Sequence, residues 1–139
     1  MSSEPAGTGH HAIILVVERD PHIRALEAFF LNEAGFGVDF AADGMAALEM
    51  ARARKPDIII TEVLVPKLDG LALCRAVRKE AELKDTVVLV FSILAAAARA
   101  REAGADAFLM KPLAEQRLVH TVRELLAKRR EGQAATEPA

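Results

Sequence analysis

Apolar residues gather in five short runs along the chain, and segments with helical spacing separate these runs. The runs at residues 12–17 and 86–91 are almost continuously apolar and rich in β-branched side chains. This composition is typical of strands buried on both faces of a parallel sheet. The whole pattern predicts five strands, at residues 12–17, 37–40, 57–61, 86–91 and 107–110.

Helix signals fill the segments between the strands. Asp20 followed by Pro21 predicts a helix start, because Asp is a good cap and Pro suits the first helical position. An Asp-Gly pair opens the second helix, and Gly35 and Gly104 end the first and the fourth. The predicted helices cover residues 21–34, 44–54, about 71–78, 95–103 and 113–130. The apolar residues at helical spacing are Ile23, Leu26, Phe30 and Ala34; Ala47, Leu48 and Ala51; Leu71, Cys74 and Val77; and Leu118, Val122 and Leu125.

This alternation of strands and helices predicts an α/β fold with one parallel sheet and helices on both faces. Right-handed crossovers place the carboxyl ends of all strands at one edge of such a sheet, where open α/β proteins keep their chemistry. Acidic, hydroxyl and lysine side chains follow four of the strands. They are Glu18-Arg19-Asp20, Thr61-Glu62, Phe91-Ser92 and Met110-Lys111-Pro112. Together they predict an anion or phosphate pocket.

Composition narrows the class of protein. The 139 residues are 52% hydrophobic and carry a formal net charge of −2, which allows a real core and gives no electrostatic reason to expect nucleic-acid binding. The single cysteine, Cys74, excludes an intramolecular disulfide and a cysteine metal cage. No apolar run approaches the roughly 20 residues of a membrane span, and the first residues lack a signal-peptide pattern. We therefore expect a cytoplasmic location without membrane contact.

We expect one domain over residues 12–130. Residues 1–11 are small and polar, which predicts disorder. Residues 131–139 look similar and are expected to form a disordered tail or a linker.

Several short motifs follow one another along the chain. They are the acidic residues and proline after the first strand, Pro56-Asp57, Pro66-x-x-Asp69-Gly70, the hydroxyl of Ser92, Ala103-Gly104-Ala105-Asp106 and Lys111-Pro112. In this order, over about residues 12–128, the chain resembles the receiver domain of two-component response regulators. The resemblance implies a flavodoxin-like (βα)5 sandwich with strand order 2-1-3-4-5 and a cis peptide before Pro112.

The resemblance also implies a phosphoryl-transfer site. In receivers, an Asp after the third strand accepts the phosphoryl group, and an acidic pair after the first strand holds Mg²⁺. A hydroxyl, a lysine and an aromatic residue respond to the modification. The positions that match the acceptor, hydroxyl, lysine and aromatic residue are Glu62, Ser92, Lys111 and Phe108. The acidic pair is replaced by Glu18-Arg19, with Asp20 one residue later, where we expect it to cap a helix.

Two substitutions argue against phosphotransfer. Glu62 stands in place of Asp, and its extra methylene moves the nucleophile by roughly an ångström, a displacement that can lower a rate about a hundredfold. Arg19 stands in place of the second acid, and a guanidinium has no lone pair for Mg²⁺, which needs oxygen ligands at about 2.0–2.1 Å. We therefore expect no catalytic residue, no metal and no other cofactor.

Two placements remain open. Arg19 either pairs with Glu62 and Glu18 where the metal would sit or is a surface charge. Ser92 either has a capping role or contacts a phosphate group. We expect Lys111 to form an ion pair with Glu62. The interval of 19 residues from Ser92 to Lys111 is about three shorter than the resemblance implies, so the segment between the fourth and fifth strands is expected to be short.

The leading hypothesis is a signalling module of the degenerate, pseudo-receiver type, which is not an enzyme and acts by protein–protein contact without phosphorylation. Its expected partner is a histidine kinase or an output protein, and a homodimer through the fourth helix, fifth strand and fifth helix is a further option. One alternative is an atypical receiver that is phosphorylated on Glu62. The other is a flavodoxin-like small-anion binder or enzyme, although the chain has no Gly-rich phosphate loop or catalytic dyad.

Overall fold

The computed structural model describes residues 12–112 and 114–136, with side chains described as far as residue 132. Five parallel strands form one sheet in the order β2-β1-β3-β4-β5, which confirms the predicted flavodoxin-like (βα)5 fold. The strands are β1 Ile13–Val17, β2 Gly37–Ala41, β3 Ile58–Thr61, β4 Val87–Ser92 and β5 Ala107–Met110. The helices are α1 Pro21–Glu33, α2 Gly44–Arg54, α3 Gly70–Lys79, α4 Ala97–Ala103 and α5 Glu115–Thr136, with a 3-10 turn η1 at Ala81–Leu83.

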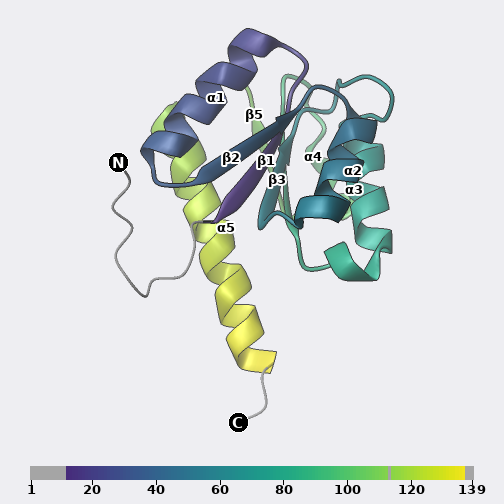
Figure 1. Ribbon diagram of the computed structural model, residues 1–139, viewed down its shortest axis with the longest axis vertical. Coiled ribbons are helices and arrows are strands. Elements are labelled where there is room, and N and C mark those ends of the chain that lie inside the picture. Colours follow the sequence, from purple (N-terminus) through teal and green to yellow (C-terminus); the bar gives the residue numbers. More distant parts are fainter. Residues whose placement is uncertain (1–11, 113, 137–139) are drawn as a thin grey trace.

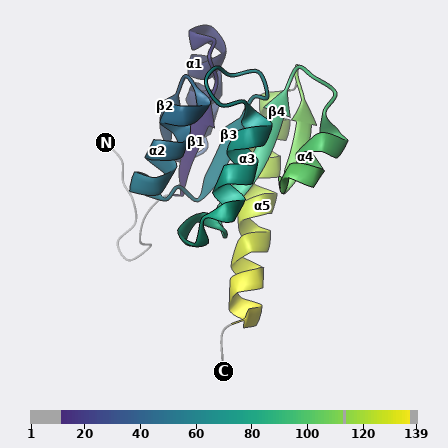
Figure 2. The same ribbon diagram turned by 90° about the vertical axis from the view of Figure 1, so that its right-hand side faces the viewer.

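Helices cover both faces of the sheet: α1 and α5 lie on one face, and α2, α3 and α4 lie on the other (Figures 1 and 2). Successive side chains of a strand point to opposite faces, so β1, β3 and β4 each supply both cores. Ile14 and Ile60 belong to the core beneath α1 and α5, whereas Leu15 and Ile59 belong to the core beneath α2, α3 and α4. Burial on both faces explains why these strands are apolar at successive positions.

Aspartates cap three of the helices at the edge where the strands end. Asp20, Asp43 and Asp69 occupy the N-cap positions of α1, α2 and α3, and each side chain accepts a hydrogen bond from a backbone N–H of the first turn. The hydrogen bonds from the backbone of His22 and Ile23 lower the pKa of Asp20. Asp20 is therefore a helix cap, as expected, and its ionised carboxylate is held by the helix that it begins.

The buried face of α1 differs from the predicted one. Leu26 is 56% exposed, and Ile23 and Phe30 are only half-buried. Glu27, Ala28 and Leu31 are buried instead. The apolar spacing of α1 is offset from its inner face because a carboxylate, Glu27, occupies part of that face.

Helix α5 continues past residue 130, into the segment predicted to form a disordered tail or a linker. It begins at Glu115 and continues to Thr136, so residues 131–136 are helical and do not form the irregular tail expected there. Good helix formers such as Glu131 and Ala134 extend the helix. Arg129 of α5 donates hydrogen bonds to the carbonyl and the carboxylate of Asp57, just before β3. Beyond this contact, α5 continues past the sheet (Figure 1). The segments 1–11 and 137–139, predicted to be disordered, lie outside the described residues.

In the part of the chain that the structure describes, none of the helices combines the length and the apolar character needed to cross a membrane.

Candidate functional site

Three carboxylates and one ammonium are buried together at the carboxyl edge of the sheet. The Lys111 Nζ atom lies 2.5 Å from Glu18 Oε1, 3.4 Å from Glu62 Oε1 and 3.6 Å from Glu27 Oε2. The four side chains are between 5% and 9% exposed. Glu18 follows β1, Glu62 follows β3, Lys111 follows β5 and Glu27 comes from α1, so the parallel topology brings distant segments to one point. The expected ion pair between Lys111 and Glu62 is present.

The carboxylate of Glu62 is held by its own strand and by the end of β4. Its Oε2 atom accepts hydrogen bonds from the backbone N–H of Val63 at 2.6 Å and Leu64 at 3.3 Å and from the hydroxyl of Ser92. Its Oε1 atom accepts from the backbone N–H of Ile93 at 3.2 Å. Both oxygens are therefore occupied by donors from the protein.

These donors keep Glu62 ionised. Burial acts to raise its pKa, but the hydrogen bond from Ser92, the charge of Lys111 and the backbone N–H groups outweigh burial and lower it. Burial likewise opposes the charge of Lys111, but the hydrogen bond to Glu18 and the neighbouring carboxylates raise the pKa of the lysine. The pair is consequently charged at neutral pH.

Of the two roles that the sequence left open for Ser92, the structure shows the one in the turn. Its hydroxyl donates to Glu62 and accepts a hydrogen bond of 3.0 Å from the backbone N–H of Leu94. The side chain is fully buried. Ser92 thus shapes the turn after β4 and holds the carboxylate of Glu62.

The sequence left two placements of Arg19 open, and the structure shows the surface one. Arg19 is exposed, and among the described residues the ion pairs of Glu18 and Glu62 are with Lys111. Lys111 is therefore the cation beside the buried carboxylates.

Sequence reasoning missed Glu27. Burial raises the pKa of this carboxyl from 4.5 to about 7, with Lys111 opposing the rise and Glu18 and Glu62 adding to it. Glu27 lies one turn after Ile23 and one turn before Leu31. This spacing on the inner side of the helix was the available signal, but charged residues on helices are usually solvated.

The carboxylates at the edge where receivers bind Mg²⁺ are engaged by groups of this protein. Glu18 Oε1 is paired with Lys111, Glu18 Oε2 accepts from the backbone N–H of Asp20, and the carboxylate of Asp20 caps α1. Across residues 12–112 and 114–132, no group of three His, Cys, Asp or Glu side chains is arranged to hold a metal ion.

Phe108 and Pro112 complete the set of predicted positions. Phe108 is half-buried and packs against the core beneath α2, α3 and α4. The peptide bond between Lys111 and Pro112 is cis, as the resemblance implied. Cys74 is fully buried in the core, and burial raises the pKa of its thiol to about 11; it is a core residue.

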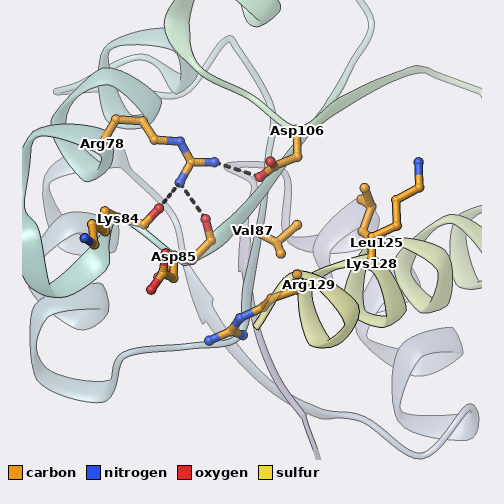
Figure 3. Close-up of a pocket in the computed structure, with 10 residues that line it drawn as sticks. Arg78, Lys84, Asp85, Val87, Asp106, Leu125, Lys128 and Arg129 are labelled. Carbon is orange, nitrogen blue, oxygen red and sulfur yellow. Dashed lines mark hydrogen bonds and ion pairs between the residues drawn. The ribbon is translucent and has the colours of Figure 1, made fainter. Parts of the chain in front are cut away.

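A cavity of about 560 Å³ lies at the opposite edge of the sheet, where β4 begins (Figure 3). Arg78 reaches across it and donates hydrogen bonds to the carbonyls of Gly104, Lys84 and Thr86 and to the carboxylate of Asp106. This arginine connects α3 to the amino ends of β4 and β5. The cavity is therefore a structural junction, remote from Glu62.

Comparison with known proteins identifies the family to which this fold belongs. A sequence model described as "Response regulator receiver domain" matches residues 14–123. The Response regulator MprA of Mycobacterium leprae is 34% identical over 129 residues, covering 91% of this chain and 56% of that protein. The Transcriptional regulatory protein CseB of Streptomyces avermitilis is 37% identical over 115 residues, covering 83% of this chain and 49% of that protein. The chain spans about half the length of these relatives.

A solved structure shows the same architecture. The crystal structure of a putative response regulator from Chloroflexus aurantiacus superimposes with a TM-score of 0.81 at 33% sequence identity, covering 84% of this chain and 98% of that chain. The protein belongs to the response regulator receiver domain family, whose members are signalling modules of two-component systems.

Proposed function

We propose that this chain is a degenerate receiver that signals by protein–protein contact without phosphorylation and without Mg²⁺. The observation that carries the proposal is the position of the Glu62 carboxylate. It is bound at once by the Ser92 hydroxyl and by Lys111, the two groups whose equivalents grip the phosphoryl group in receivers. The longer side chain of Glu62 reaches the place that a phosphoryl oxygen would take.

The charge of the site supports the same conclusion. A phosphoryl donor is an anion, and it would approach a buried cluster in which three carboxylates surround one ammonium. With Glu62 only 5% exposed and both its oxygens engaged, the nucleophile is neither free nor accessible. Without a divalent cation to shield the approach, like charges repel.

The proposed mode of action is a fixed conformation of the loop after β4. The N–H of Ile93 is bound to Glu62, and the N–H of Leu94 is bound to Ser92, so the loop is tied to β3 in the unmodified protein. A partner would meet one constant surface there. We infer a cytoplasmic module that contacts a histidine kinase or an output protein, with self-association through α4, β5 and α5 as a further mode, and with no direct contact to nucleic acid or membrane.

The test is intact mass after incubation with acetyl phosphate and Mg²⁺. The natural chain, Glu62→Asp, and an Arg19→Asp, Glu62→Asp double variant would be compared, with Glu33→Gln as a surface control on α1. We expect no adduct of phosphoryl mass on the natural chain or the control, and an adduct on the double variant. An adduct on the natural chain at Glu62 would overturn the proposal and favour the atypical, phosphorylatable receiver.

A second measurement tests the fixed loop directly. Amide hydrogen exchange at Ile93 and Leu94 should be slow in the natural chain without any phosphoryl donor, and at least about tenfold faster in Glu62→Ala, which removes the acceptor of the Ile93 N–H. Equal exchange rates in the two proteins would show that Glu62 does not hold the loop.

A further inference from the structure

A small apolar groove lies beside the charged cluster, between α1 and the start of α5. Its volume is about 320 Å³, at the lower end of the range for small-molecule sites. Aliphatic and aromatic side chains make most of its wall. They include Ile23, Leu26 and Phe30 from α1, Phe91 and Ile93 from the end of β4, and Pro112 after β5.

One carboxylate of the groove lacks the hydrogen bonds that its neighbours have. Glu27 lines the groove, and its side chain is 8% exposed. Glu18 and Glu62 both accept hydrogen bonds from protein donors, whereas the nearest group to Glu27 is the Lys111 ammonium at 3.6 Å, which it shares with the other two. At 3.6 Å this ion pair is longer than the contacts of Lys111 with Glu18 and Glu62, so Glu27 is the carboxylate that the protein holds least tightly. A buried carboxylate with free acceptor capacity favours a donor from a ligand.

The charges around the groove determine which sign of charge the ligand should carry. Lys111 lines the groove and faces three carboxylates, and Glu115 adds a fourth acid to the wall of the groove. An anionic ligand would meet this excess of negative charge. A cation would relieve it and would also meet the aromatic faces of Phe30 and Phe91, which attract positive charge. The ring of Phe91 already has the Lys111 ammonium 5.2 Å from its centroid.

We propose that this groove binds a small apolar amine, with one ring or a short alkyl chain on the apolar wall and its ammonium group on the carboxylate of Glu27. The exposed side chains of Leu26 and Ile93, 56% and 58% exposed, flank the site and would be covered by the apolar part. Binding of the amine also draws the carboxylate of Glu27 away from Lys111. Because Lys111 is paired with Glu62 as well, this change links the groove to Glu62. The site does not depend on whether Glu62 accepts a phosphoryl group.

The experiment compares three probes of similar shape on the full chain at pH 8. They are 2-phenylethylamine, the neutral 2-phenylethanol and the anionic 3-phenylpropanoate, titrated to 10 mM while backbone amide shifts are followed by NMR. We expect the amine to shift amides of residues 23–30 and 91–93 and to bind at least about tenfold more tightly than the alcohol, as a charge-assisted hydrogen bond predicts. The carboxylate should not bind.

Variants locate the charge that is responsible. Glu27→Gln keeps the shape of the side chain and should weaken amine binding about tenfold while leaving alcohol binding unchanged. Glu33→Gln, an exposed acid on the same helix, should change neither. The inference is wrong if the amine binds the natural chain no better than the alcohol, if Glu27→Gln binds it as tightly as the natural chain, or if the shifts fall outside the groove. Equal binding of amine and alcohol would identify the groove as a generic apolar docking surface for a protein side chain.

Discussion

Replacing Glu27 by Gln should make the stability of the domain less dependent on pH. The folded state raises the pKa of Glu27 from 4.5 to about 7, chiefly through burial. The charged groups that face it are Lys111, Glu18 and Glu62. Between these two pH values, the unfolded chain releases the proton and the folded protein keeps it. The stabilising contribution of Glu27 is therefore fully present below pH 4.5 and is lost as the pH rises to about 7.

The magnitude follows from the size of the rise. Each pKa unit corresponds to about 1.4 kcal/mol, so between pH 4.5 and pH 8 the natural chain should lose about 3 kcal/mol more unfolding free energy than Glu27→Gln. The side chain is only 8% exposed, so screening by solvent reduces this value little. The lowered pKa of Glu62 acts in a different interval, because its contribution is lost only as the pH falls below about 4.5.

Urea denaturation at pH 4.5, 6 and 8 measures this difference. Unfolding of the natural chain, Glu27→Gln and the surface control Glu33→Gln would be followed by circular dichroism. The slopes of unfolding free energy against urea concentration are compared first, because equal slopes show that the variants differ in stability alone. The control should track the natural chain at every pH. If Glu27→Gln shows the same pH dependence as the natural chain, Glu27 does not titrate in this interval and the burial argument fails.

Four further variants probe the site and the fold. Lys111→Met removes the one cation among the buried carboxylates and should lower the unfolding free energy by about 3–5 kcal/mol, measured by urea denaturation at pH 7; a loss below about 1 kcal/mol would contradict the buried ion cluster. Arg19→Ala should change stability by less than about 0.5 kcal/mol in the same assay because Arg19 is exposed, and a larger loss would restore the discarded pairing with Glu62. Gly44→Ala should lower the melting temperature strongly, since an added Cβ would overlap the carbonyl of Leu68. Gly132→Ala, where an added Cβ meets nothing within 4 Å, should raise stability by about 0.5–1 kcal/mol, and similar melting shifts for both glycine variants would refute the close approach at Gly44.

The sequence allowed the fold to be predicted because local signals agree with the global topology. Apolar runs such as 12–17 mark strands with two buried faces, and the aspartate at position 20 marks a helix start that the structure uses in that way. Because the carboxyl ends of parallel strands meet at one edge of the sheet, the sequence alone then predicted that Glu62 lies beside Lys111. Agreement between propensity, capping and topology is what makes these predictions dependable.

The parts that could not be predicted depend on side-chain direction and burial. Arg19 follows a strand and could point inward or outward, and only the backbone geometry decides that it is exposed. Glu27 has the spacing of a residue on the inner side of α1, but glutamate is almost always solvated on helices, so its burial was not predicted. The extension of α5 to Thr136 was missed because residues 131–139 have the same small and polar composition as residues 1–11, which is typical of irregular segments.

The bound carboxylate of Glu62 has a consequence for timing. A switch responds because the ligand that selects its second state comes and goes, and a ligand that is always present cannot shift a population from one moment to the next. Here the anion bound by Ser92 and Lys111 is the carboxylate of Glu62, which is part of the polypeptide. Its effective concentration is set by the length of one side chain. If Glu62 is not phosphorylated, as proposed above, regulation in time through this site requires an agent that competes with Glu62 for its donors, or control over how much of the protein is present.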